Sequence, residues 1–254
     1  MTSFTVYWQP GCTSCLKTKE FLRSHGIPFE SVNVREDAGA MERLARLGAK
    51  SIPVVTRGDE FVFGQDLDAV AHFVGVAVTR TKLPTPVLVA RLIALLDLAA
   101  IYAEGLPESS SGTRLPGRER TYLDLAYHVP QIVVGFLDAA LGGRLTFEHF
   151  ERRPPEHVVT GADAARITRS VSHALAVWWS VNQARLPLSV DTYYGLQPLD
   201  GVLERTTWHA AQHVRQLERV LQLLGVESRA LLPASLLDGL PLPHDVWDAE
   251  VPLQ

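Results

Sequence analysis

The sequence predicts two domains of different fold class, an α/β domain over residues 1–78 and an all-α four-helix bundle over residues 84–226. In the first part, short alternating apolar runs are separated by short helical stretches, as in a small α/β fold. After residue 86, four long stretches carry apolar residues at three- and four-residue spacing, which is typical of helices in a bundle. Residues 75–86 contain two prolines and follow no period, so we place the domain boundary there.

Composition and charge exclude several classes of protein. The 254 residues are 46% hydrophobic and 20% charged, and the net charge of −4 and pI near 6.1 argue against a nucleic-acid partner bound through a basic face. No uninterrupted apolar run in the sequence reaches the length of about 18 residues that a membrane span needs, and the first residues lack a signal-peptide pattern. We therefore expect a cytoplasmic protein with no nucleic-acid and no membrane partner.

Seven short elements are expected in the first domain, separated by glycine, proline or polar turns. In order they are a strand at 4–7, a helix at 15–25, a strand at 29–34, a helix at 40–47, strands at 52–55 and 60–63, and a helix at 66–74. The last two strands flank Arg57-Gly58-Asp59, which is typical of a hairpin. The order β-α-β-α-β-β-α is that of a thioredoxin-like domain.

Both cysteines of the chain lie close together, as Cys12-Thr13-Ser14-Cys15 after the first predicted strand. Two cysteines at this spacing do not form the disulfide framework of a secreted domain. The pair is therefore either redox-active or one half of a zinc site, and the lack of a second pair favours redox chemistry. A pair that has lost its activity is the third interpretation.

Two further motifs accompany the cysteines, Ser51-Ile52-Pro53 before the third strand and Gly64-Gln65-Asp66 at the start of the last helix. With these motifs at these spacings, the first domain resembles a glutaredoxin. The resemblance implies thiol-disulfide exchange, in which Cys12 lies at a helix N-terminus that favours its thiolate and attacks the substrate. Cys15, one turn further into the helix, would then be the resolving thiol.

The same resemblance implies a binding site for glutathione or another low-molecular-weight thiol beside the cysteine pair. A backbone group next to a cis-proline would hold the thiol peptide, and the last motif would receive the amino end of glutathione. The residues implied in binding are Ile52, Pro53, Gly64, Gln65 and Asp66. Many glutaredoxins have a lysine shortly before the first cysteine, whereas this chain has Tyr7-Trp8-Gln9. Arg43 or Lys50 would have to contact the glutathione carboxylate instead.

Four amphipathic stretches are expected to form the helices of the second domain. They span residues 87–102, 121–141, 162–184 and 198–224. Beyond the bundle, residues 227–254 contain Pro233, Pro241 and Pro243 and are expected to pack on it as a tail. The bundle could also serve as the interface of a homodimer.

Two histidines in the fourth helix, His209 and His213, are four residues apart. They lie roughly 40° apart around the helix axis, so both imidazoles can reach one point in space. His128, in the second predicted helix, can complete a three-histidine set of metal ligands. The alternative is that these histidines only fill surface or core positions, as a lone His-x-x-x-His pair often does.

Residues 86–225 resemble the DinB family, also called DinB/YfiT-like. The resemblance rests on a four-helix bundle with one histidine in its second helix and a His-x-x-x-His motif, within residues 208–217, in its fourth. The resemblance implies that His128, His209 and His213 bind a divalent ion, zinc, nickel or iron, with positions left open for water or a thiolate. Family members of known activity use low-molecular-weight thiols such as mycothiol or bacillithiol, as isomerases and S-transferases. Neutral imidazoles leave the full charge on the ion, so a bound thiol or water becomes a nucleophile near neutral pH.

The favoured hypothesis is a thiol-dependent enzyme that acts on a small electrophilic or disulfide substrate. Its glutaredoxin module would exchange thiols and disulfides with glutathione, and its metal site would activate a thiol or water for transfer or hydrolysis. One alternative is a glutathione-dependent disulfide oxidoreductase whose helical domain binds a partner or senses metal. Others are a metal-binding stress module whose cysteines sense oxidation, and an iron site with oxygen chemistry, as in the related sulfoxide synthases.

Several side chains near these motifs have both a structural and a functional interpretation. Candidates to orient the ligand imidazoles are Asp124, Glu204 and Gln212. We expect the pairs Trp178-Trp179 and Tyr193-Tyr194 in the core rather than in a substrate wall, and Arg152-Arg153 in a solvated loop. Asp163 is expected to cap a helix.

Overall fold

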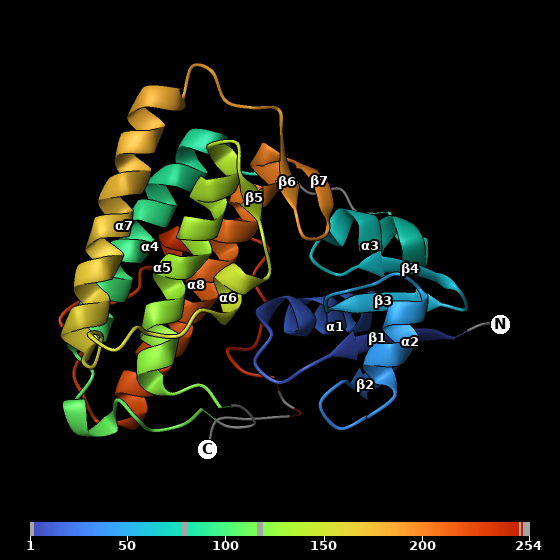
Figure 1. Cartoon of the computed structure of the whole chain (residues 1–254), viewed down its shortest axis with the longest axis horizontal. Coiled ribbons are helices and arrows are strands. Elements are labelled where there is room, and N and C mark those ends of the chain that lie inside the picture. Colours follow the sequence, from blue (N-terminus) through green and yellow to red (C-terminus); the bar gives the residue numbers. More distant parts are fainter. Residues whose placement is uncertain (1–2, 78–80, 116–118, 249, 251–254) are drawn as a thin grey trace. The chain divides into compact units, whose positions relative to one another are not determined.

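The computed structural model describes residues 3–77, 81–115, 119–248 and 250. The chain forms two compact units (Figure 1). Unit 1 comprises residues 1–81 together with residues 243–254, and unit 2 comprises residues 82–242. The predicted boundary between residues 78 and 84 agrees with this division.

Unit 1 has the predicted element order. Its elements are β1 (Phe4–Trp8), α1 (Thr13–Ser24), β2 (Phe29–Asn33), α2 (Ala40–Arg46), β3 (Val54–Arg57), β4 (Glu60–Phe63) and α3 (Leu67–Val74). The strands form one sheet in the order β2-β1-β3-β4, in which β1 and β2 are parallel and the other pairs antiparallel. The prediction of a thioredoxin-like domain is confirmed.

Alternating side chains of the two central strands fill two separate hydrophobic cores, because successive residues of a strand point to opposite faces. Tyr7 and Val54 belong to one core, which also contains Cys15, whereas Val6 and Val55 belong to the other. Both faces of the sheet are therefore buried, which explains why the strands are apolar at consecutive positions.

The C-terminal segment completes unit 1 around a buried charge. Lys19 on α1 is fully buried, and its Nζ lies 2.6 Å from Asp248 Oδ2 and 2.9 Å from Glu250 Oε1. The ring centre of Trp8 lies 3.4 Å from the same nitrogen. These partners are needed because an unpaired charge in the interior costs several kcal/mol. The prediction that the whole tail packs on the bundle is therefore wrong from Pro243 onward.

Unit 2 is built on four long helices that match the predicted ranges within a few residues. They are α4 (Thr85–Glu104), α5 (Tyr122–Ala140), α7 (Gly161–Asn182) and α8 (Leu199–Leu223). Figure 1 shows these helices side by side, with α4 and α5 each packed against both α7 and α8. A stretch of α4 has a mean hydropathy of 1.9, which would suit a membrane span, but a buried core helix has the same composition.

The second domain is largely helical, but the prediction that it is all-α is wrong. A three-stranded sheet joins β5 (Arg144–Leu145), β6 (Ser189–Thr192) and β7 (Gly195–Pro198) in that order. The strands are short, and β5 pairs with a segment far along the chain, so no local pattern predicts that pair, whereas β6 and β7 are adjacent in the sequence. Short helices complete the unit: η1 (Glu108–Ser110), α6 (Glu148–Glu151) and η2 (Ala234–Leu236).

Two bundle helices begin with a reciprocal pair of hydrogen bonds. At α5, the Asp124 backbone N–H donates to Thr121 Oγ1 at 3.1 Å, and the Thr121 N–H donates to the Asp124 carboxylate at 2.7 Å. Thr160 and Asp163 form the same arrangement at α7. These bonds satisfy amide groups that have no partner within the helix. The predicted role of Asp163 as a cap is confirmed.

Close packing at the start of α7 leaves no room for a side chain at Gly161, where a Cβ atom would lie 1.9 Å from the carbonyl oxygen of Ala103. We expect Gly161→Ala to lower the free energy of unfolding by about 1–3 kcal/mol through overpacking, measured by urea denaturation. Gly112→Ala is the matched control, because a Cβ at Gly112 meets nothing within 4 Å. An equal loss of stability in both variants would contradict this explanation.

Candidate functional site

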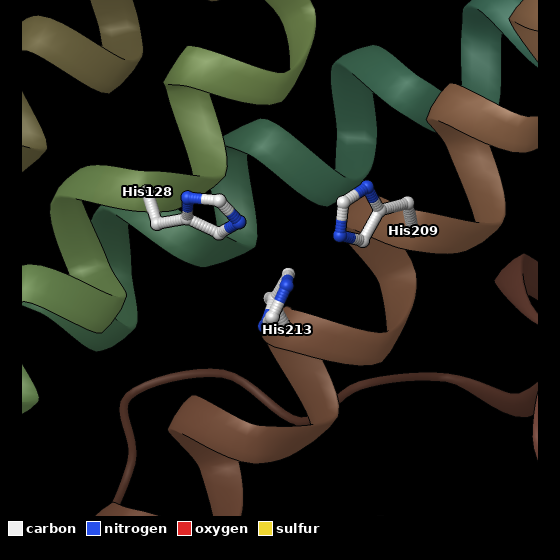
Figure 2. A group of neighbouring side chains, drawn as sticks. All are labelled: His128, His209 and His213. Carbon is white, nitrogen blue, oxygen red and sulfur yellow. The ribbon is translucent and has the colours of Figure 1, made fainter. Parts of the chain in front are cut away.

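Three histidine side chains converge in unit 2 (Figure 2). His128 comes from α5, and His209 and His213 come from successive turns of α8. One ring nitrogen of each lies within 4.8 Å of the other two. The ring centres are 4.8 to 5.7 Å apart. The structure therefore brings together the three residues that the sequence predicts as metal ligands.

The histidine rings are buried, and buried ring nitrogens need partners. The nitrogens that face one another lie within 4.8 Å, and in His209 the one that faces the other two rings is Nε2 rather than Nδ1 (Figure 2). A divalent ion is a partner that an imidazole nitrogen can take, and three imidazoles are a suitable donor set for zinc, nickel or iron. The residues present therefore fit the predicted kind of ion.

Burial lowers the pKa of His209 well below its usual range. The positive charges of the adjacent imidazole, Arg205 and Arg120 act in the same direction. The ring is therefore neutral at pH 7. A neutral imidazole is the form that binds a metal ion, because a proton would occupy the ligand nitrogen.

Gln216 orients one of the three rings. Its Oε1 lies 2.7 Å from Nδ1 of His213, and both side chains are buried on α8. A carboxamide oxygen only accepts hydrogen bonds, so Nδ1 carries the proton and Nε2 keeps the lone pair that a metal ion needs. Gln216 belongs to residues 208–217, which carry the resemblance to the DinB family, but it is not among the side chains expected to orient the imidazoles. Its spacing of three residues from His213 on a helix is a usable signal for that role.

One residue predicted to orient the imidazoles has a different role. Asp124 caps α5, and its carboxylate also lies 2.7 Å from Nη1 of Arg153, so that prediction is wrong. Gln212 accepts a hydrogen bond from Arg215 at 2.7 Å. Glu204 is buried on α8. A contact of these last two residues with the imidazoles stays a prediction.

Aromatic side chains surround the histidines. The ring centre of Phe150, on α6, lies 5.5 Å from that of His209 and 6.2 Å from that of His128. The ring centre of Tyr193 lies 6.0 Å from that of Phe150, so a residue expected in the core packs against the ring that contacts the histidines. Trp178, in contrast, is buried in the bundle. No pattern in the sequence identifies Phe150, because α6 is a single turn within a predicted loop.

In unit 1, Cys12 and Cys15 form a disulfide with their Cα atoms 5.1 Å apart. Cys12 is the N-cap of α1, and its Sγ accepts a hydrogen bond from the backbone N–H of Cys15 at 3.2 Å. The free amides of a helix N-terminus favour negative charge on this sulfur once the disulfide is reduced. Cys12 is partly exposed and Cys15 fully buried, so Cys12 is the sulfur that a substrate can reach.

The residues predicted to bind a thiol peptide lie in two loops that contact each other. The peptide bond between Ile52 and Pro53 is cis, and Ile52 packs in the same core as Cys15. Gln65 is buried and donates from Nε2 to the carbonyl oxygen of Ile52 at 2.7 Å. Asp66 caps α3. Gln65 and Asp66 thus hold the loops in place, and their contact with glutathione stays a prediction.

Gly64 connects these loops to α1. Its carbonyl oxygen accepts a hydrogen bond from Thr18 Oγ1 at 3.1 Å. A Cβ atom at Gly64 would lie 2.5 Å from Thr18 Oγ1 and 2.8 Å from Pro53 Cγ. Only glycine permits this close approach. Arg43, a candidate to contact a glutathione carboxylate, forms an ion pair with Asp37.

Comparison with known proteins agrees with this geometry. The model of the glutaredoxin family matches residues 4–62. The glutaredoxin-like protein NrdH of Lactococcus lactis subsp. lactis is 34% identical over 59 residues, which cover 23% of this chain and 81% of that protein. By its first domain, the chain belongs to the glutaredoxin family. This domain is accordingly a glutaredoxin-type thiol-disulfide oxidoreductase, and the separate roles of Cys12 and Cys15 stay a prediction.

Two further relatives and one solved structure are also similar to parts of this chain. NrdH of Salmonella typhimurium is 39% identical over 57 residues, covering 22% of this chain and 70% of that protein. The hybrid peroxiredoxin hyPrx5 of Haemophilus influenzae is 31% identical over 64 residues, 25% of this chain and 27% of that protein. A solved glutathione transferase homologue from Sulfitobacter, with bound glutathione, aligns over 85% of both chains at 14% identity. Its TM-score of 0.32 is too low to show a shared fold.

The cysteine roles are testable with an aromatic disulfide, 5,5′-dithiobis(2-nitrobenzoate), added to the reduced protein. We expect Cys12→Ser to slow the reaction by more than roughly 100-fold, because the remaining thiol is buried. Cys15→Ser should release one thionitrobenzoate and keep the other in a disulfide with Cys12, since no second thiol displaces it. Thiolate release gives the rate of each reaction, and the intact mass shows which group stays on the protein. Comparable rates in the two variants would contradict the assignment.

Proposed function

We propose that the protein is a thiol-dependent metalloenzyme attached to a glutaredoxin domain. His128, His209 and His213 would hold a divalent ion, zinc, nickel or iron, and the site would activate a thiol or water for transfer to, or hydrolysis of, a small electrophile. The glutaredoxin domain would exchange thiols and disulfides with glutathione or another low-molecular-weight thiol. The observation that carries the proposal is the approach of three buried ring nitrogens to within 4.8 Å of one another.

The chemistry of the donor set supports a catalytic rather than a structural ion. A structural zinc ion usually has four protein ligands, whereas three leave a position for a substrate. When bound, such an ion makes a coordinated thiol or water a nucleophile at neutral pH. The neutral state of His209 and the orientation of His213 by Gln216 both suit metal binding.

The arrangement of the bundle also supports this proposal. The ligands come from the second and fourth long helices, as in the DinB family that residues 86–225 resemble. Known members of that family work with low-molecular-weight thiols, and a glutaredoxin domain handles thiols of the same class. In this proposal one domain reduces or exchanges the thiol and the other domain uses it, so both act on the same class of molecule.

The second candidate function is a glutathione-dependent disulfide oxidoreductase whose helical domain only binds a partner or senses metal. It is favoured by the completeness of the glutaredoxin domain, which contains the cysteine pair, the cis-proline loop and the α3 cap. The NrdH protein of Lactococcus lactis is matched over 81% of its length by this domain alone.

Metal analysis decides between the two functions. We expect about one equivalent of zinc, nickel or iron per chain in protein purified without a metal-binding tag, and less than about a tenth in His128→Ala/His209→Ala. His173→Ala, an exposed histidine on α7, is the control and should keep its metal. Wild-type protein that contains no metal and resists reloading would favour the second function.

The role of Gln216 is testable separately. We expect Gln216→Leu to weaken zinc binding by about 10- to 100-fold, because His213 loses the partner that fixes its ring, measured by competition with a chromogenic chelator. Gln222→Leu makes the same change at an exposed position of α8 and should bind zinc like the wild type. Equal affinity in the two variants would show that Gln216 does not orient the ligand.

A further inference from the structure

A buried arginine precedes the histidine site by one helical turn. Arg205, His209 and His213 follow one another at four-residue spacing on α8, so their side chains lie on one face of the helix. Arg205 is 5% exposed and His209 is 7% exposed. A guanidinium group stays charged at any physiological pH, so the face carries a permanent positive charge beside the site.

Aromatic rings hold the Arg205 guanidinium in one position. Its central carbon lies 5.4 Å from the ring centre of Phe150, 5.9 Å from that of Tyr193 and 5.5 Å from that of Tyr194. Nη2 donates a hydrogen bond to the Tyr193 hydroxyl at 3.1 Å. Phe150 also contacts His209 at 5.5 Å between ring centres. Phe150, Tyr193 and Tyr194 therefore form an aromatic wall that fixes Arg205 and, through Phe150, reaches His209.

A second positive charge acts on the same histidine. Arg120, just before α5, donates a hydrogen bond to the carbonyl oxygen of Phe150. Burial and the positive charge of Arg153 lower the pKa of Arg120 to about 10, so its side chain remains protonated at neutral pH. The charges of Arg120 and Arg205 both act on His209. Two cations close to one site favour an anionic ligand over a neutral or cationic one.

We propose that Arg205, assisted by Arg120, is a carboxylate-binding subsite for a small molecule whose reactive group reaches the three histidines. The inference rests on the proposed metalloenzyme function and adds the substrate class, a thiol that also carries a carboxylate. A guanidinium offers paired N–H groups whose geometry matches a carboxylate, and the aromatic wall keeps it rigid, so little ordering is needed on binding.

The test compares two thiols that differ in one group, 3-mercaptopropionate and 3-mercaptopropanol. The full chain is loaded with cobalt(II), and the thiolate-to-cobalt absorption band gives the dissociation constant of each thiol. We expect Arg205→Gln to lower the preference for the carboxylate thiol by about 10- to 100-fold and to leave the binding of the alcohol unchanged. Arg219→Gln, an exposed arginine on α8, should keep the wild-type preference. Any chelation of cobalt by the carboxylate is common to all variants.

The outcomes separate the subsite from the metal site. Cobalt binding with the same preference in wild type, Arg205→Gln and Arg219→Gln would overturn the subsite and leave the metal site intact. Failure of the wild type to bind cobalt would overturn both. If Arg205→Gln does not fold, Tyr193→Phe replaces it, because the change removes the hydroxyl that fixes Arg205 and keeps its charge. We expect a loss of preference of about threefold in that variant, and no loss would overturn the subsite.

Discussion

Unit 2 depends on three imidazole rings that are packed together inside its bundle, because the surrounding residues must provide partners for their buried nitrogens. Each ring has two nitrogens that lose water on burial, and an unsatisfied buried polar atom costs about 1–3 kcal/mol. Charge on the rings would cost more, which is why burial keeps His209 neutral. The bundle satisfies one nitrogen through Gln216 and directs a nitrogen from each ring toward the others, an arrangement that a cation would stabilise.

The glutaredoxin domain makes the sulfur of Cys12 reactive by different means. Cys12 depends on backbone amides at the start of α1 and on its partial exposure, whereas the histidines depend on side-chain neighbours and burial. The first arrangement needs a turn and a helix of modest length. The second needs two long helices in a fixed register, so it is more sensitive to changes in packing. The two units therefore place different demands on their sequences.

Local patterns predicted most of what local forces determine. The strands and helices of unit 1 and the four long helices of unit 2 follow from periodicity and turn residues, and the spacing of His209 and His213 places both on one helical face. That His128 joins them depended on family resemblance, because helix pairing is not encoded locally. The β5–β6 pair and the ion pair of Lys19 with Asp248 were missed, since both join segments far apart in sequence.

The buried ion pair also bears on the order in which the protein is made. Lys19 and Glu250 are 231 positions apart, so the ribosome delivers the ammonium group long before the carboxylates. N-terminal domains generally fold first during synthesis. Here, the glutaredoxin domain cannot reach its final form until Asp248 and Glu250 have been translated. The bundle is in this sense a long insertion within the first domain, and any cut in it separates the glutaredoxin domain from part of its own structure.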